Sequence, residues 1–165
     1  MPLYQQDCTA LAKDVLRVCG ETNLKLATAE SCTGGLIAAY LTDIAGSSSV
    51  VERGFVTYSN EAKNEMLGVP LDLINALGAV SEDVARKMAE GAVKNSRADI
   101  AVSVTGIAGP GGDTKDKPVG LVHMAAAKTA CDTLHEKHIF TGDRDDVRQQ
   151  TVAAALKLVL QITNN

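Results

Sequence analysis

Apolar residues recur along this chain with two different periods, which predict helices and strands in alternation. Leu11, Val15 and Cys19 have the spacing of one face of a helix. The short, mostly apolar run at 100–105 is instead typical of a strand buried on both faces. Ser81 precedes two acidic residues and is expected to cap the helix that follows it.

Extended along the whole chain, this pattern predicts six helices and five strands. The predicted helices cover residues 5–19, 34–44, 60–67, 72–77, 81–95 and 143–162. The predicted strands cover residues 24–29, 50–58, 100–105, 119–127 and 133–140. The two types alternate at first, and the last two strands follow each other as an antiparallel pair. We therefore expect one domain, residues 1–165, folded as a three-layer α/β/α sandwich with a mixed, mostly parallel sheet.

Composition and charge narrow the classes of function. The net charge is −4, Trp is absent, and Lys and Arg form no cluster, so neither a nucleic-acid partner nor a membrane surface is expected. The four cysteines lack metal-ligand spacing and are expected to be reduced thiols, so no metal is predicted. Because no signal peptide or membrane-spanning run is evident, the expected location is the cytoplasm.

Two segments follow predicted strands at the edge where open α/β sheets bind ligands. The first, 31–35, places Ser31 before a helix, and its two glycines allow close approach of the backbone to a ligand. Its free N–H groups and positive helix end could hold an anion or a developing oxyanion. The same local pattern is also typical of Ser31 or Thr33 acting only as a helix cap. The second segment, 105–112, is glycine-rich and could wrap a phosphate, or could be a loop without function.

A nucleophilic serine needs a base, and the histidines do not supply one. His123 lies in an apolar strand and is interpreted as a core residue, while His135 and His138 are three apart on a strand and face opposite ways. That leaves Lys63, which could act as a base if burial lowered its pKa, or could be an exposed helix lysine. Cys32 is a rival nucleophile but is interpreted as a small buried neighbour.

Cationic side chains near the last predicted helix raise the question of an anionic ligand. Arg144 and Arg148 lie one turn apart at its start, where positive charge opposes the helix dipole. Either neighbouring aspartates or an anionic ligand would explain them.

Taken together, the motifs resemble the CinA C-terminal domain family, whose stand-alone members are nicotinamide-nucleotide amidases. The resemblance covers about residues 8–162 in order. It rests on AESCTGG at 29–35, GSS at 46–48, GFVTYSNEAK at 54–63, TGIAGP at 105–110 and KPVG at 117–120. It implies hydrolysis of nicotinamide mononucleotide to nicotinate mononucleotide and ammonia, without a metal or cofactor. It also implies that Ser31 is the nucleophile, Lys63 the general base and Tyr58 a residue that relays or orients the proton.

The chemistry of the remaining candidate residues suggests which of them bind the substrate. The oxyanion hole is expected from the backbone N–H groups of Cys32, Thr33, Gly34 and Gly35. Ribose or phosphate is expected at Thr105, Gly106, Gly109, Gly111 and Gly112. Ser48 is expected to bind the carboxamide or support Lys63, and Arg144 to reach the phosphate, in a protein expected to be a homo-oligomer.

Two other functions stay open at this point. One is a nucleotide-binding regulatory domain without turnover, in which Ser31 only caps its helix. The other is a short-chain-dehydrogenase-like oxidoreductase, which is disfavoured because Tyr58 and Lys63 are one residue too far apart for a Tyr-x-x-x-Lys dyad.

Overall fold

The computed structural model describes residues 5–165 and contains one five-stranded sheet, in the order β2-β1-β3-β4-β5. The strands are β1 Leu26–Glu30, β2 Val51–Val56, β3 Ile100–Gly106, β4 Leu121–Lys128 and β5 Leu134–Ile139. Strands β2, β1 and β3 pair in parallel, whereas β4 is antiparallel to both of its neighbours. Because only β4 points the other way, the prediction of a mixed, mostly parallel sheet is confirmed.

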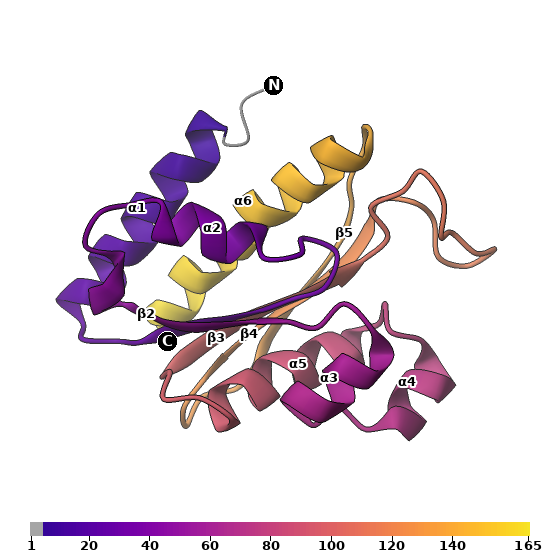
Figure 1. Ribbon diagram of the computed structural model, residues 1–165, viewed down its shortest axis with the longest axis horizontal. Helices are drawn as coiled ribbons and strands as arrows, with labels where there is room; N and C mark the ends of the chain where they lie inside the picture. The colour runs from indigo at the N-terminus through magenta and orange to yellow at the C-terminus, as the bar shows by residue number, and fades with distance from the viewer. Residues whose placement is uncertain (1–4) are drawn as a thin grey trace.

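Helices cover the sheet on both faces, which completes the predicted α/β/α sandwich (Figure 1). One face carries α1 Gln6–Glu21, α2 Leu36–Thr42 and α6 Arg144–Thr163. The other face carries α3 Asn60–Leu67, α4 Leu71–Leu77 and α5 Glu82–Lys94. Within residues 5–165, no helix combines the length and the apolar character that crossing a bilayer would require.

The central strand β1 explains why the chain is rich in small aliphatic residues. All five of its residues are buried, because helices press on both sides of the sheet. Leu26 belongs to the core under α1 and α6, while Ala27 and Ala29 belong to the core under α5. Small side chains on this second face let α5 lie close to the sheet.

Hydrogen bonds at two helix starts were not anticipated from the sequence. Asp143, predicted as the first residue of the last helix, instead caps α6, and its side chain accepts from the N–H groups of Asp145 and Asp146. Ser81 stands in the corresponding place before α5 but does not cap it. Its hydroxyl donates instead to Gly78 O at 3.0 Å, which ties down the connection from α4.

Candidate active site

The turn between β1 and α2 places Ser31 at the carboxyl edge of the sheet. Ser31 N–H donates to Val104 O of the neighbouring strand at 3.1 Å, so the serine backbone is fixed to β3. The turn closes when Gly34 N–H donates to Ser31 O at 3.0 Å. Gly34 and Gly35 have φ of 60° and 101°, a left-handed region that glycine adopts without a Cβ clash.

Lys63 reaches Ser31 from the first turn of α3. That helix begins after Ser59, whose hydroxyl accepts from Ala62 N–H at 3.0 Å. The Lys63 side chain points into the protein and is 1% exposed. Its Nζ lies 3.0 Å from Ser31 Oγ, and burial lowers the pKa of the amine below its ordinary value. The exposed-lysine alternative is therefore excluded.

The other neighbours of Lys63 Nζ define what its amine can do. Nζ donates to Thr57 O at 3.0 Å and to Tyr58 O at 3.4 Å, and within the described part of the chain it forms no ion pair. A neutral amine has two N–H donors and one lone pair. It therefore satisfies two carbonyls by donating and can accept the hydroxyl proton of Ser31.

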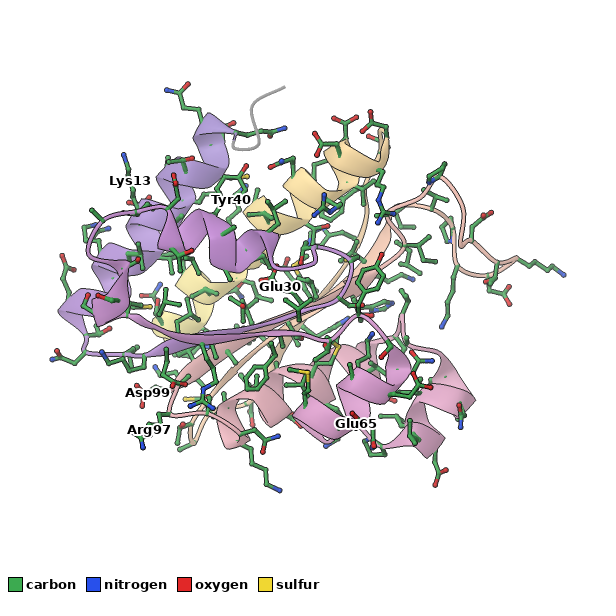
Figure 2. All side chains as sticks on the ribbon, viewed as in Figure 1. Lys13, Glu30, Tyr40, Glu65, Arg97 and Asp99 are labelled. Atoms are coloured by element: carbon green, nitrogen blue, oxygen red, sulfur yellow. The ribbon has the colours of Figure 1, made fainter. Side chains whose placement is uncertain are left out.

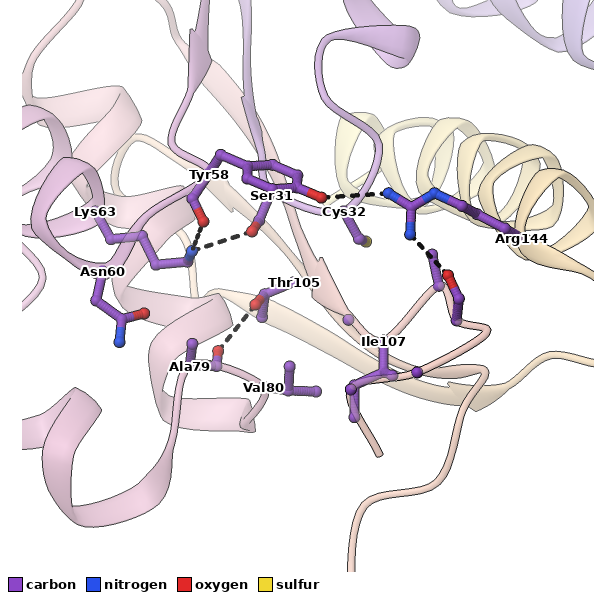
Figure 3. A pocket seen from close by; sticks show the side chains of 15 residues that line it. Ser31, Cys32, Tyr58, Asn60, Lys63, Ala79, Val80, Thr105, Ile107 and Arg144 are labelled. Carbon is purple, nitrogen blue, oxygen red and sulfur yellow. Dashed lines mark hydrogen bonds between the residues drawn. The ribbon is translucent and has the colours of Figure 1, made fainter. Parts of the chain in front are cut away.

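Both groups lie on the wall of a cavity of about 330 Å³ at the carboxyl edge of the sheet (Figure 3). Its walls come from the turn after β1, the segment after β2, the connection before α5, the loop after β3 and the start of α6. The lining residues are Ser31, Cys32, Tyr58, Asn60, Lys63, Ala79, Val80, Thr105, Gly106, Ile107, Ala108, Gly109, Gly111, Gly112 and Arg144. Both segments singled out in the sequence therefore contribute to one cavity.

Four of the residues expected at the site do not line this cavity: Thr33, Gly34, Gly35 and Ser48. Ser48 is exposed in a short 3₁₀ turn, Ser47–Ser49, that precedes β2. The cavity lies beyond the other end of the parallel strands, so Ser48 supports neither Lys63 nor the cavity wall. In the sequence, Ser48 comes before a predicted strand rather than after one, and this position could have excluded it from a site at the carboxyl ends of the strands.

A buried carboxylate occupies the helix end that was expected to receive a ligand. Glu30 is fully buried between the sheet and α2 (Figure 2). It accepts from Ile37 N–H at 2.8 Å and from Ala38 N–H at 3.0 Å, and from the Thr33 hydroxyl at 2.7 Å. The chain itself thus neutralises the positive end of α2. Neither Ser31 nor Thr33 is the residue that caps this helix.

The turn consequently leaves few N–H groups for an oxyanion. Gly34 N–H is engaged with Ser31 O, and Gly34 and Gly35 serve the shape of the turn. Thr33 is held at two points, because its hydroxyl donates to Glu30 and its carbonyl accepts from Arg148 Nη2 at 2.9 Å. Cys32 is the residue of the expected oxyanion hole that both follows Ser31 and lines the cavity.

Tyr58 lies in the site, but its hydroxyl points away from the serine. The phenol oxygen accepts from Arg144 Nη2 at 3.2 Å, and in residues 5–165 it makes no hydrogen bond to Ser31 or Lys63. Arg144 also donates through Nη1 to Gly109 O at 2.8 Å. One guanidinium thus joins three remote segments at the mouth of the cavity. A proton relay through the phenol has no hydrogen-bonded path here.

Several contributors to the wall carried no sequence signal. Ala79 and Val80 lie in the connection before α5, where nothing in the pattern suggested a site. Thr105 explains the position of that connection, because its buried hydroxyl donates to Ala79 O at 2.9 Å. Asn60, in the quoted motif, also lines the cavity although it was given no role.

The rival nucleophile and the histidines fall outside the chemistry of this cavity. Burial raises the pKa of the Cys32 thiol to about 12, so the thiolate is not available near neutral pH. His123 Nδ1 lies 2.9 Å from His135 Nε2, between β4 and β5 and away from Ser31. Burial is the main reason that the pKa of His123 falls to about 4. Across residues 5–165, no three His, Cys, Asp or Glu side chains are placed to hold a metal ion.

Comparison with known proteins gives relatives of two lengths. Nicotinamide-nucleotide amidohydrolase PncC of Escherichia coli K12 is 54% identical over 134 residues, which are 81% of each chain. A CinA-like protein of Geobacter sulfurreducens is 52% identical over 142 residues, which are 86% of this chain and 34% of that protein. Other curated relatives are also longer, and the chain spans 36% to 39% of their length.

Solved structures and a family model indicate the same family as these relatives. The crystal structure of the competence/damage inducible protein CihA from Agrobacterium tumefaciens superposes with a TM-score of 0.95 at 48% identity, covering 100% of both chains. The model of the CinA C-terminal domain matches residues 8–163. The protein described here belongs to the CinA C-terminal domain family.

Proposed function

We propose that this chain hydrolyses the carboxamide of nicotinamide mononucleotide, giving nicotinate mononucleotide and ammonia. The observation that carries the proposal is the 3.0 Å contact between the buried amine of Lys63 and the hydroxyl of Ser31 on a cavity wall. The name of the Escherichia coli relative, nicotinamide-nucleotide amidohydrolase, supports this choice of substrate.

In the first half of the proposed reaction, Ser31 is acylated. Neutral Lys63 takes the proton of Ser31 Oγ, and the oxygen attacks the carboxamide carbon. The Cys32 N–H stabilises the oxygen that becomes negative in the tetrahedral intermediate. The carbon–nitrogen bond then breaks, the lysine ammonium returns its proton to the leaving nitrogen, and ammonia departs from a nicotinoyl ester on Ser31.

In the second half, water replaces the amine. Lys63 accepts a proton from a water molecule, whose oxygen attacks the ester carbon. The bond from carbon to Ser31 Oγ breaks and Lys63 restores the proton to the serine. The product is released as the carboxylic acid, which loses its proton to solvent and becomes nicotinate. The protons of the serine, the leaving amine and the attacking water thus all pass through one nitrogen atom, which explains why a single unpaired amine suffices.

The opposite end of the cavity suits the phosphate. Arg144 is the cationic group there, and the backbone at Gly109, Gly111 and Gly112 lies on the same wall. Guanidinium groups and glycine-rich backbone are both common phosphate ligands. Because Arg144 donates to Gly109 O and Tyr58 in the unbound chain, it would exchange these partners for phosphate oxygens.

The test is ammonia release from nicotinamide mononucleotide by the purified chain and three variants. Ser31→Ala should lower kcat by on the order of 10³-fold or more. Lys63→Met should lower it by about 10² to 10⁴-fold, since it removes the general base. Ser48→Ala is the matched control, because it makes the same chemical change as Ser31→Ala at an exposed position outside the cavity.

Two results would contradict the proposal. One is unchanged ammonia release after Ser31→Ala. The other is binding of nicotinamide mononucleotide, measured by calorimetry, without any ammonia release by the wild-type chain; this would favour the nucleotide-binding domain without turnover.

A further inference from the structure

We propose that Tyr58 binds the pyridinium ring of the substrate against its aromatic face, and so selects the oxidised, cationic ring over the neutral dihydropyridine ring. The inference rests on the proposed function and names a determinant of specificity that the reaction chemistry does not require. The Tyr58 side chain lies in the site but makes no hydrogen bond to Ser31 or Lys63 among the described residues.

The position of Tyr58 in the cavity is the first observation. Its ring lies between the Ser31–Lys63 pair at one end and Arg144 at the other (Figure 3). The substrate has the same order of groups, with the carboxamide at one end, the ring in the middle and the phosphate at the far end. With the amide at Ser31 and the phosphate at Arg144, the ring comes beside Tyr58.

The side chain is also free to receive a ligand. Tyr58 is 62% exposed and lines the cavity, so much of its ring surface is open to a ligand. In the unbound chain its hydroxyl accepts from Arg144 Nη2 at 3.2 Å, which holds the ring at the cavity mouth before a substrate enters. The contact that Tyr58 makes with Lys63 comes from its backbone oxygen and remains in any variant of the side chain.

Charge supplies the third observation. Among the described residues that line the cavity, none is Asp or Glu, and Tyr58 is the only aromatic one. A positively charged ring entering this cavity therefore meets no carboxylate. The face of an aromatic ring carries negative charge density and attracts cations, which makes Tyr58 the group that can compensate the pyridinium.

The experiment compares two variants that lose the same hydroxyl. Tyr58→Phe and Tyr58→Leu both abolish the bond to Arg144, but only Tyr58→Phe keeps an aromatic face. Each change is combined with Ser31→Ala so that no turnover occurs. Calorimetry then gives the dissociation constants of oxidised and reduced nicotinamide mononucleotide. Ammonia release by the single variants gives KM and kcat separately.

Binding through the ring face predicts a specific pattern. Tyr58→Leu should weaken binding of the oxidised nucleotide by roughly 3- to 30-fold, the range of a cation–π contact, and change binding of the reduced one much less. Tyr58→Phe should stay within about threefold of the parent for both nucleotides, since a phenyl face also attracts cations. In the active enzyme, Tyr58→Leu should raise KM while kcat changes little.

Three results would overturn the inference. They are equal binding by the Leu and Phe variants, equal losses for the oxidised and reduced nucleotides, and a fall in kcat that is the same in both single variants, as a proton relay would give. Failure of the proposed function looks different, because it removes ammonia release from the wild-type chain and leaves the calorimetric comparison intact.

Discussion

Replacing Glu30 by Gln tests whether this buried carboxylate holds the turn that presents Ser31. The substitution keeps the shape of the side chain and removes one negative charge. Glu30 Oε1 accepts from Ile37 N–H and the Thr33 hydroxyl, and Oε2 accepts from Ala38 N–H at 3.0 Å. A glutamine can keep its oxygen toward the first pair, but its NH₂ group then faces the N–H of Ala38, donor against donor.

The cost follows from these three bonds. The lost bond to Ala38 N–H was made to a charged acceptor and is worth about 1.5 to 3 kcal/mol. The two remaining bonds become neutral and each weaken by about 1 kcal/mol. Removing a charge from a fully buried position recovers part of this, because desolvation of that charge no longer opposes folding. We expect a net loss of about 2 kcal/mol in the free energy of unfolding.

Urea unfolding followed by circular dichroism measures this loss. Glu65→Gln is the matched control, since it makes the same chemical change at an exposed position on α3 and should stay within about 0.5 kcal/mol of wild type (Figure 2). The Glu30 variant should also release ammonia more slowly, because the turn that carries Ser31 loses its support. A Glu30 variant as stable as the Glu65 control would refute the reasoning.

Two further predictions concern groups whose surroundings are unusual. Burial lowers the pKa of Lys63, so kcat/KM for ammonia release should rise with pH as the amine loses its proton. The midpoint of this rise should lie below about 10.4, the usual lysine pKa. A pH–rate profile that does not rise in this way would argue against Lys63 as the base. Thr28 is fully buried on β1 and its hydroxyl has no hydrogen-bond partner among residues 5–165, so Thr28→Val should raise the free energy of unfolding by about 1 kcal/mol; a lower urea midpoint for this variant would contradict it.

Much of the fold could be predicted because local signals and burial agree. The run at 100–105 is mostly apolar, which indicated a strand covered on both faces, and β3 is covered by α5 and α6. The predicted helix at 60–67 matches α3 at both ends, because Ser59 caps it and Gly68 ends it in a left-handed conformation. Ser81 misled because its hydroxyl competes for a nearby carbonyl, a choice that the sequence pattern does not reveal.

The site was predictable to the extent that strand ends determine it. Ser31 and the loop that begins at Thr105 follow neighbouring parallel strands, so they meet at one edge. The direction of the Tyr58 ring depends on Arg144, which comes from a helix 86 residues further along the chain. Ser48 is polar like the residues of the site, but it precedes β2, and the direction of that strand places it at the amino-terminal edge of the parallel strands, opposite the cavity. Such placements depend on tertiary packing, which single-sequence patterns do not contain.

In the described part of the chain, two buried ionisable side chains, Glu30 and Lys63, lie close to Ser31 without pairing with each other. A carboxylate next to Lys63 would favour its protonated form, and a protonated amine cannot accept the serine proton. Glu30 precedes Ser31 directly, yet it forms no ion pair with Lys63 within residues 5–165, because Thr33 and the first turn of α2 occupy its oxygens. Lys63 in turn meets only carbonyls and a hydroxyl, and its pKa stays low. The bonds from α2 to Glu30 therefore support the turn and also keep its charge away from the amine on which the proposed chemistry depends.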